Sequence, residues 1–309
     1  MVLQVHLFIF SFRMVKKAFI TGFIIFLGYS LYISNYKTYS ASQNQNQDNL
    51  VKAQQYMYND FVPENVIVGT SLSCHIHTES LKNFYNLAFN GSSIYDGLNV
   101  ILNGNKLPQN VFIESNLYLN DKSDLLYSQL FDVYPFYTSK FLPILRVVNQ
   151  PIGKLISCMN PLGDRIVEKH NLFMKRVHDY FYNISNLLSV HQKTKVSLFD
   201  KMINVQFHNF SNLPSKSVLN NKLKELELIV NVLKSKHINV FFFEMPINYK
   251  LMKTKRVQYL REKLHAKFIS RVIFTVDDTA CYKTSDGVHL NELESNQYSL
   301  FFKNKILKN

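Results

Sequence analysis

The chain has 309 residues, a hydrophobic content of 47% and a formal net charge of +13. Its length and ordinary hydrophobic content indicate one large globular domain or two small ones. The Lys and Arg residues are scattered along the chain without a dense basic block, which argues against nucleic-acid binding and fits a surface beside an anionic membrane or envelope polymer.

An uncharged apolar run is the first predicted element. From residue 18 the chain reads AFITGFIIFLGYSLYI, and extending it to residue 35 gives a helix long enough to cross a bilayer. Arg13, Lys16 and Lys17 precede the run, whereas a single lysine closely follows it. The positive-inside rule therefore predicts cytoplasmic residues 1–17, a transmembrane anchor at 18–35 and export of the rest of the chain.

A cleaved signal peptide is the alternative to an anchor. Residues 39–41 offer no good pair of small residues for cleavage, and the apolar run is longer than the core of a usual signal peptide. The sequence MVKKAF, beginning at Met14, also resembles a translation start. We favour an uncleaved, single-pass anchor.

A polar segment follows the anchor. Residues 40–49 read SASQNQNQDN and are poor in core-forming side chains, so residues 36–58 are predicted to be a flexible linker. The folded domain is predicted to occupy residues 59–309.

The domain alternates short apolar runs with helical patterns. Residues 218–236 carry apolar side chains at helical spacing and lead into the apolar run at 238–246, as in a βαβ unit with a buried parallel sheet. The prediction is a three-layer α/β/α sandwich with about five parallel strands. The predicted strands are residues 65–69, 84–89, 110–114, 238–246 and 271–276. Residues 117–214 are mostly helical in pattern and are predicted to be an insertion or lid.

Two short motifs carry residues suited to acyl-transfer chemistry. Ser71 follows the first predicted strand, where Gly69 permits a tight turn that exposes the hydroxyl. Asp286 precedes His289 by three residues, a spacing that lets the carboxylate orient an imidazole acting as general base. The structural alternatives are that Ser71 and Asp286 cap helices. The two motifs together favour a catalytic triad of Ser71, His289 and Asp286.

The motifs resemble those of the SGNH (GDSL-like) hydrolase superfamily. The sequence GTS, ending at Ser71, matches the first block, FNGSS the second through Gly91, IESN the third through Asn116, and DGVH the last through Asp286 and His289. This resemblance covers the chain from about residue 65 to its end, outside the helical middle. It implies a flavodoxin-like sandwich and an oxyanion hole formed by Gly91 and Asn116, and it implies no cofactor or metal.

Two blocks depart from the family pattern. Thr70 replaces the usual Asp of the first block, and the third block retains only Asn116. Such altered blocks beside an N-terminal anchor resemble the branches that modify cell-envelope polysaccharides or teichoic acids. The expected function is O-acylation of an envelope polymer through an acyl-serine, with the membrane, the polymer and a membrane-bound acyl-donor partner as partners. The alternatives are a carbohydrate or lipid esterase of the same fold and a noncatalytic envelope assembly protein.

Other reactive side chains near these motifs receive structural interpretations. Cys74 is predicted to be a small buried thiol, because no cue for thiolate activation accompanies it. His75 and His77 are predicted to face different directions from a helix as surface or core residues. Glu244, at a strand end, is assigned either to the pocket lining or to capping and packing. The three cysteines, Cys74, Cys158 and Cys281, show no CxxC pair and no zinc-ligand spacing. Their number is compatible with one disulfide and one free thiol.

Overall fold

The structure is a computed structural model. It describes residues 12–35, 44–78, 81–104, 106–151, 198–274, 276 and 282–306. The central part of the predicted insertion, the region considered for signal-peptide cleavage, and Cys158 and Cys281 lie outside these residues.

Five strands form one parallel sheet in the described part of the chain, and each lies within a predicted strand. The strands are β1 (Asn65–Val68), β2 (Phe84–Asn86), β3 (Asn110–Glu114), β4 (Asn239–Phe243) and β5 (Val272–Phe274). Their spatial order is β2-β1-β3-β4-β5. The chain therefore extends the sheet in opposite directions from β1, and the loops that leave β1 and β3 diverge at the carboxyl edge, which is where ligands bind in open parallel sheets.

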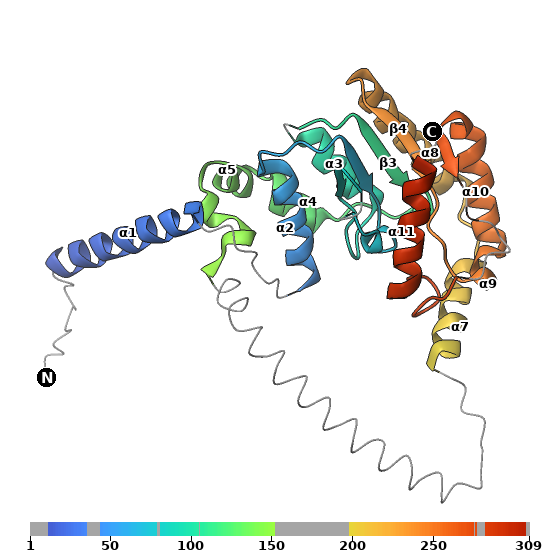
Figure 1. Ribbon diagram of the computed structural model, residues 1–309, viewed down its shortest axis with the longest axis horizontal. Coiled ribbons are helices and arrows are strands. Elements are labelled where there is room, and N and C mark those ends of the chain that lie inside the picture. The colour runs from blue at the N-terminus through green and yellow to red at the C-terminus, as the bar shows by residue number, and fades with distance from the viewer. Residues whose placement is uncertain are drawn as a thin grey trace, which may run out of the picture.

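Helices cover both faces of this sheet (Figure 1). The α-helices of the described residues are α1 (Phe12–Asn35), which projects from the domain, and α2 (Gln45–Tyr58), α3 (Ile94–Asn103), α4 (Asp124–Phe131), α5 (Val133–Phe141), α7 (Leu198–Ser211), α8 (Lys216–Ser235), α9 (Tyr249–Met252), α10 (Lys255–Phe268) and α11 (Glu292–Ile306). The described residues also contain four short 3-10 helices, η1 (Ser73–His75), η2 (Pro143–Leu145), η3 (Val147–Asn149) and η4 (Ile269–Arg271). The mixed α/β class predicted from the sequence is confirmed.

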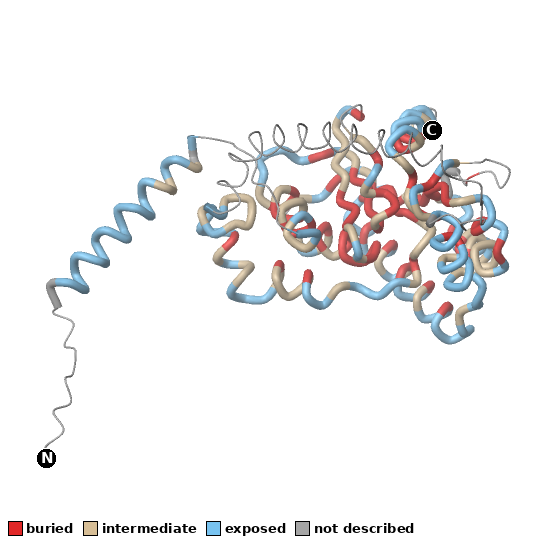
Figure 2. Tube along the Cα trace, turned by 90° about the horizontal axis from the view of Figure 1, so that it is seen from below, coloured by how far each residue is buried: buried red, intermediate tan, exposed pale blue. Residues whose placement is uncertain are grey.

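The alternation of side chains along each strand divides the core in two. Val111 and Ile113 of β3 pack into a cluster with α2, α3, α4, α8 and α10, whereas Phe112 between them packs against Phe302 of α11 on the opposite face. Both sides of the strands are buried, as a parallel sheet with helices on both faces requires. Figure 2 shows this buried centre, from which the exposed α1 projects.

The helix predicted before β4 is present as α8. Its apolar side chains at helical spacing are buried, and Ser215 caps its N-terminus by accepting a hydrogen bond from the Val218 amide. A fully buried leucine such as Leu226 contributes about 1.5–3 kcal/mol relative to an exposed one. Burial of one helical stripe thus attaches α8 to the sheet and positions β4.

Helix α1 is the one helix in the described residues that is long and apolar enough to cross a membrane. The candidate span, Met14–Ile33, has 20 residues, equivalent to about 30 Å at 1.5 Å per residue. The helix begins at Phe12, earlier than the predicted anchor at residue 18, and includes Lys16 and Lys17. Their long side chains can reach the membrane interface while their backbone stays helical.

The prediction of a flexible linker over residues 36–58 is wrong for its second half. Residues from Gln45 form α2, which begins with an Asn44 cap and buries Leu50, Ala53 and Tyr56 in the larger core cluster. The segment's polar composition concealed these apolar residues, which recur at helical spacing. The folded part of the chain therefore includes α2, ahead of the predicted boundary at residue 59.

The described parts of the predicted insertion are helical, as expected. Helices α4 and α5 lead from the first part of the segment, and α7 ends at Ser211, close to the predicted end at residue 214. Ile203 of α7 is buried against the turn at Gly287. The insertion thus contributes directly to the surroundings of the predicted catalytic turn.

Candidate active site

Ser71 lies on the loop between β1 and η1, at the carboxyl edge of the sheet. Gly69 in this loop is packed so closely that a Cβ atom there would lie 1.8 Å from Ser73 Oγ and 2.7 Å from Glu114 Oε2. Only glycine fits without displacing these side chains. The tight approach explains why Gly69 immediately precedes the segment that carries Ser71.

The loop is held by the buried carboxylate of Glu114 at the end of β3. Glu114 Oε2 accepts a hydrogen bond from the Thr70 amide at 2.9 Å, and the Thr70 hydroxyl donates to Oε1, also at 2.9 Å. The amide and the hydroxyl of Ser73 also donate to this carboxylate. Burial raises the pKa of Glu114, against the opposing effect of these hydrogen bonds. Glu114 lies in the third sequence block, IESN, in which only Asn116 matched the family pattern, and its supporting role was not predicted.

Asp286 and His289 lie on a tight turn that precedes α11. The Ser285 amide donates to the His289 carbonyl at 2.8 Å, and Gly287 adopts a φ of 101°, in the region that favours glycine. Asp286 Oδ1 accepts hydrogen bonds from the amides of Val288 and His289 at 3.0 and 2.8 Å. The carboxylate is therefore fixed by its own turn before it contacts the imidazole.

The three predicted catalytic side chains meet in the geometry of a serine triad. His289 Nε2 lies 2.8 Å from Ser71 Oγ, and His289 Nδ1 lies 2.7 Å from Asp286 Oδ2. The carboxylate favours the tautomer that carries a proton on Nδ1, which leaves Nε2 to accept the serine proton. The side chains of His289 and Asp286 are 29% and 27% exposed, so the site is accessible to a substrate.

Acid is expected to remove the stabilising contribution of Asp286. Burial raises the pKa of Asp286, but hydrogen bonds from the His289 amide and ring and from the Val288 amide outweigh burial and leave it below its ordinary value of 3.8. Since the folded-state pKa is below the unfolded value, the contribution is present above pH 3.8 and is lost as pH falls through the folded-state pKa. Melting temperatures of the wild type and Asp286→Asn should thus converge in acid. A melting-temperature difference that stays constant as the pH falls from above 3.8 through the folded-state pKa would contradict the stabilising role of the Asp286 carboxylate.

The triad opens into a shallow pocket with polar walls. Its lining includes Ser71, His75, Asn90, Gly91, Ser285 and His289, together with Asn44, Gln45 and Asp48 from the start of α2. Gly91 adopts a φ of 65°, and a Cβ there would lie 2.7 Å from Gln45 Nε2. Gly91 therefore lines the same pocket as Ser71.

Helix α2 also fixes the turn that carries Gly91. Asn49 is buried, donates from Nδ2 to the Asn90 carbonyl at 2.8 Å and accepts from the Asn90 amide at 3.0 Å. In the described part of the chain, the amides of Ser71 and Gly91 have no hydrogen-bond partner. Two backbone donors, of Ser71 itself and of Gly91, thus remain available in this part of the chain.

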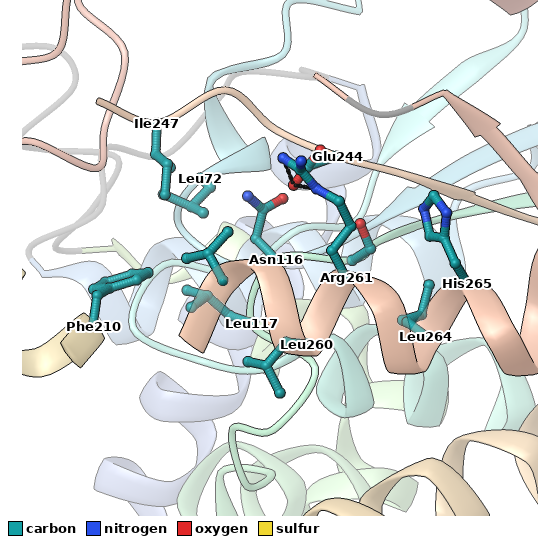
Figure 3. Close-up of a pocket in the computed structure, with 12 residues that line it drawn as sticks. Leu72, Asn116, Leu117, Phe210, Glu244, Ile247, Leu260, Arg261, Leu264 and His265 are labelled. Atoms are coloured by element: carbon teal, nitrogen blue, oxygen red, sulfur yellow. Dashed lines mark hydrogen bonds and ion pairs between the residues drawn. The ribbon is translucent and has the colours of Figure 1, made fainter. Parts of the chain in front are cut away.

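The structure does not place Asn116, predicted as an oxyanion-hole donor, among the residues that line the triad pocket. Asn116 Nδ2 donates to the Met245 carbonyl at 2.8 Å, and its Oδ1 accepts from the Met245 amide at 2.7 Å, so the side chain ties the β3 loop to the segment after β4. Asn116 lines a separate narrow cavity beside α10, together with Leu72 and Arg261 (Figure 3). Sequence order alone did not show that both ends of the amide are occupied by backbone groups.

His75 and Asn90 are site residues that the sequence analysis missed. The His75 ring lies edge-on to the ring of His289, with centroids 6.0 Å apart, because η1 turns back toward the pocket. Burial lowers the pKa of His75, and the neighbouring His289 lowers it further. Asn90 could have been suspected from its position directly before Gly91.

The remaining candidates take structural positions. The Cys74 thiol lies 3.0 Å from the Ala88 carbonyl, and burial raises its pKa to about 11, which disfavours the reactive thiolate. Glu244 lines the narrow cavity of Figure 3, where it forms an ion pair with Arg261 at 3.0 Å. Its other oxygen accepts from the Val276 amide at 2.8 Å. Glu244 thus packs below the strand end, away from the triad pocket.

The described residues contain no group of three His, Cys, Asp or Glu side chains placed to hold a metal ion. No protein-family model, curated protein or solved structure matches the chain. The chemistry of the site is therefore interpreted from its own geometry.

Proposed function

We propose that the protein is a serine-dependent acyl-transfer enzyme. The observation that carries this proposal is the continuous hydrogen-bonded series from Ser71 Oγ through His289 to Asp286, with contacts of 2.8 and 2.7 Å. A structural role for these side chains would not require a hydroxyl aligned on one imidazole nitrogen and a carboxylate on the other. Their position at the carboxyl edge of a parallel sheet further supports a catalytic role.

In the proposed first step, Ser71 Oγ attacks the carbonyl carbon of an acyl ester while His289 Nε2 takes the hydroxyl proton. Asp286 stabilises the imidazolium that forms. The tetrahedral intermediate then collapses, the bond to the leaving alcohol breaks, and His289 returns the proton to that alcohol. The product is an acyl-serine. In the second step an acceptor hydroxyl gives its proton to His289 and attacks the acyl-serine, the bond from the acyl carbon to Ser71 Oγ breaks, and His289 returns the proton to Ser71 Oγ.

The oxyanion of each tetrahedral intermediate needs hydrogen-bond donors. We assign this role to the backbone amides of Ser71 and Gly91, which line the same pocket and have no partner in the described residues. Asn90, which also lines this pocket, is assigned the donor role first given to Asn116. Removing one such donor in comparable sites costs about 2.7–4 kcal/mol of transition-state stabilisation.

The particular class we propose is an SGNH-type hydrolase fold. The strand order β2-β1-β3-β4-β5 is the flavodoxin-like order. Along the chain, the four sequence blocks lie after β1, after β2, at the end of β3 and before α11. The two departures also have a common physical explanation. Thr70 donates its hydroxyl to Glu114, so a second carboxylate at position 70 would face a buried acid, whereas threonine supplies a hydrogen bond.

The proposed acceptor is a hydroxyl of an envelope polysaccharide or related polymer. Side chains of Asn44, Gln45, Asp48 and Asn90 line the pocket and provide both donors and acceptors suited to a polyhydroxylated ligand. An anchor at α1, with its N-terminus in the cytoplasm, would hold the domain outside the cell beside membrane-linked substrates. A membrane-bound partner that supplies the acyl group fits this arrangement.

An esterase is the second candidate, and the shape of the pocket favours it. The triad pocket is open to solvent in the described residues, so water can reach an acyl-serine. Hydrolysis and transfer share the first step and differ only in the attacking hydroxyl. The distinction therefore requires a measurement of products.

A fluorophosphonate probe and an acyl-ester donor together test the proposal. We expect the probe to label the wild type but not Ser71→Ala, and we expect acylated glycan to form from the donor when envelope glycan is added. Ser71-dependent release of free acid without acylated glycan would support the esterase instead. Absence of labelling in a folded wild-type protein, with no turnover of several acyl esters, would favour a noncatalytic assembly role.

A further inference from the structure

Helix α5 and the following turn expose a row of apolar side chains on one face. Val133, Tyr134, Tyr137 and Phe141 are 76%, 77%, 52% and 65% exposed, and they recur at the spacing of one helical face. The rings of Tyr137 and Phe141 stack 6.0 Å apart. The row continues into η2, where Leu145 is 46% exposed. We call these five residues the α5 face. Contiguous exposed apolar surface of this kind marks an interaction site.

The opposite side of α5 is fixed to the domain. Gln54 of α2 is buried, donates to Ser139 Oγ at 3.2 Å and accepts from the Val147 amide at 2.9 Å. Arg146 donates to the Ser139 carbonyl at 2.8 Å and lies over the ring of Tyr58, 4.5 Å from its centroid. These hydrogen bonds hold the inner side of α5 against α2, so the apolar row on the other side of α5 faces outward from the domain.

The α5 face lies at the end of the candidate membrane span. The Tyr29 hydroxyl of α1 donates to the Asn149 carbonyl of η3 at 2.7 Å, and α1 also contacts η2. Figure 1 shows α5 beside the end of α1 from which the chain enters the domain. Tyr29 is four residues before the end of the span at Ile33, at the depth where tyrosines collect in membranes.

We propose that the α5 face is a membrane-docking surface that lies in the lipid interface beside the α1 anchor. Tyrosine and phenylalanine place their rings among the headgroups and upper acyl chains, while the cation Lys140 suits anionic headgroups. Lys140 lies over the rings of Phe136 and Phe141, with centroid distances of 5.6 Å. The anchor then acts as more than a tether, because a second contact fixes the orientation of the domain on the bilayer. The proposal is independent of whether Ser71 is catalytic.

The chain offers a direct spectroscopic test because its sequence contains no tryptophan. A single introduced tryptophan is therefore a unique fluorophore. The full chain is reconstituted into phosphatidylcholine and phosphatidylglycerol vesicles, with and without lipids brominated on the upper acyl chain. Tyr134→Trp and Phe141→Trp report on the α5 face. Tyr32→Trp in α1 is the positive control, and Tyr249→Trp on α9, at the opposite end of the domain, is the matched exposed control.

We expect brominated lipid to reduce the emission of Tyr134→Trp and Phe141→Trp, as it does that of Tyr32→Trp, while Tyr249→Trp keeps its emission. If brominated lipid quenched the tryptophan at position 32 but not those at positions 134 and 141, the proposal would be overturned. The α5 face would then be assigned to contact with a protein partner. Equal quenching at 249 would also overturn it, since the domain would then contact lipid without a preferred face. Loss of quenching at position 32 would overturn both the anchor and the docking surface.

Discussion

Ser71→Ala and His289→Ala are each expected to reduce kcat by about 10⁴- to 10⁶-fold, the range seen when a nucleophile or its base is removed from a serine triad. The hydroxyl and the imidazole act as one unit through the 2.8 Å contact between Ser71 Oγ and His289 Nε2. The double variant should therefore lose little more activity than either single variant. Steady-state turnover of an acyl ester by all three variants measures this.

The control for Ser71→Ala is Ser235→Ala. Ser235 is exposed at the end of α8 and donates only to the Val232 carbonyl of its own helix. Its replacement should leave kcat unchanged, and circular dichroism should show the same fold for all variants. If Ser71→Ala retained wild-type turnover while remaining folded, the proposed mechanism would be wrong.

Glu114→Ala is expected to lower the free energy of unfolding by about 3–5 kcal/mol, because it leaves the buried donors of Thr70 and Ser73 without an acceptor. Such a loss is a large part of the roughly 5–15 kcal/mol that stabilises a typical domain. Glu114→Gln keeps one acceptor oxygen and should be less destabilising. Urea denaturation measures these differences.

A matched acidic residue separates this effect from a simple loss of charge. Glu225 on α8 is paired with Lys222 at 2.9 Å, and its side chain is 45% exposed. Glu225→Ala should change the free energy of unfolding by about 1 kcal/mol or less. A Glu114→Ala protein as stable as Glu225→Ala would show that the carboxylate does not hold the Ser71 loop.

The sequence predicted the strands and the triad from local information. Apolar runs such as the one ending in β4 are continuous because both faces of a parallel strand are buried. Asp286 and His289 are three residues apart, so one turn brings the carboxylate to the imidazole without help from the rest of the fold. The position of Ser71 was predicted because a residue directly after a parallel strand must emerge at the carboxyl edge of the sheet.

Tertiary packing decided the rest of the site. The polar segment before residue 59 folds as α2 because its few apolar residues meet the core, and Asn49 then fixes the Asn90 turn over a separation of 41 residues. The amide of Asn116 is occupied by Met245, a partner 129 residues away that no local pattern indicates. His75 reaches His289 only because η1 and the last turn come together.

The sequence by itself therefore determined the α/β class, the five strands and the three triad residues, since periodicity and short spacings are local properties. Only the tertiary structure decided which groups surround the triad, where Glu114 acts and which face of α5 remains exposed. Hydrogen bonds and burial between distant segments depend on the packed arrangement of helices on the sheet, and that arrangement leaves no local signature in the chain.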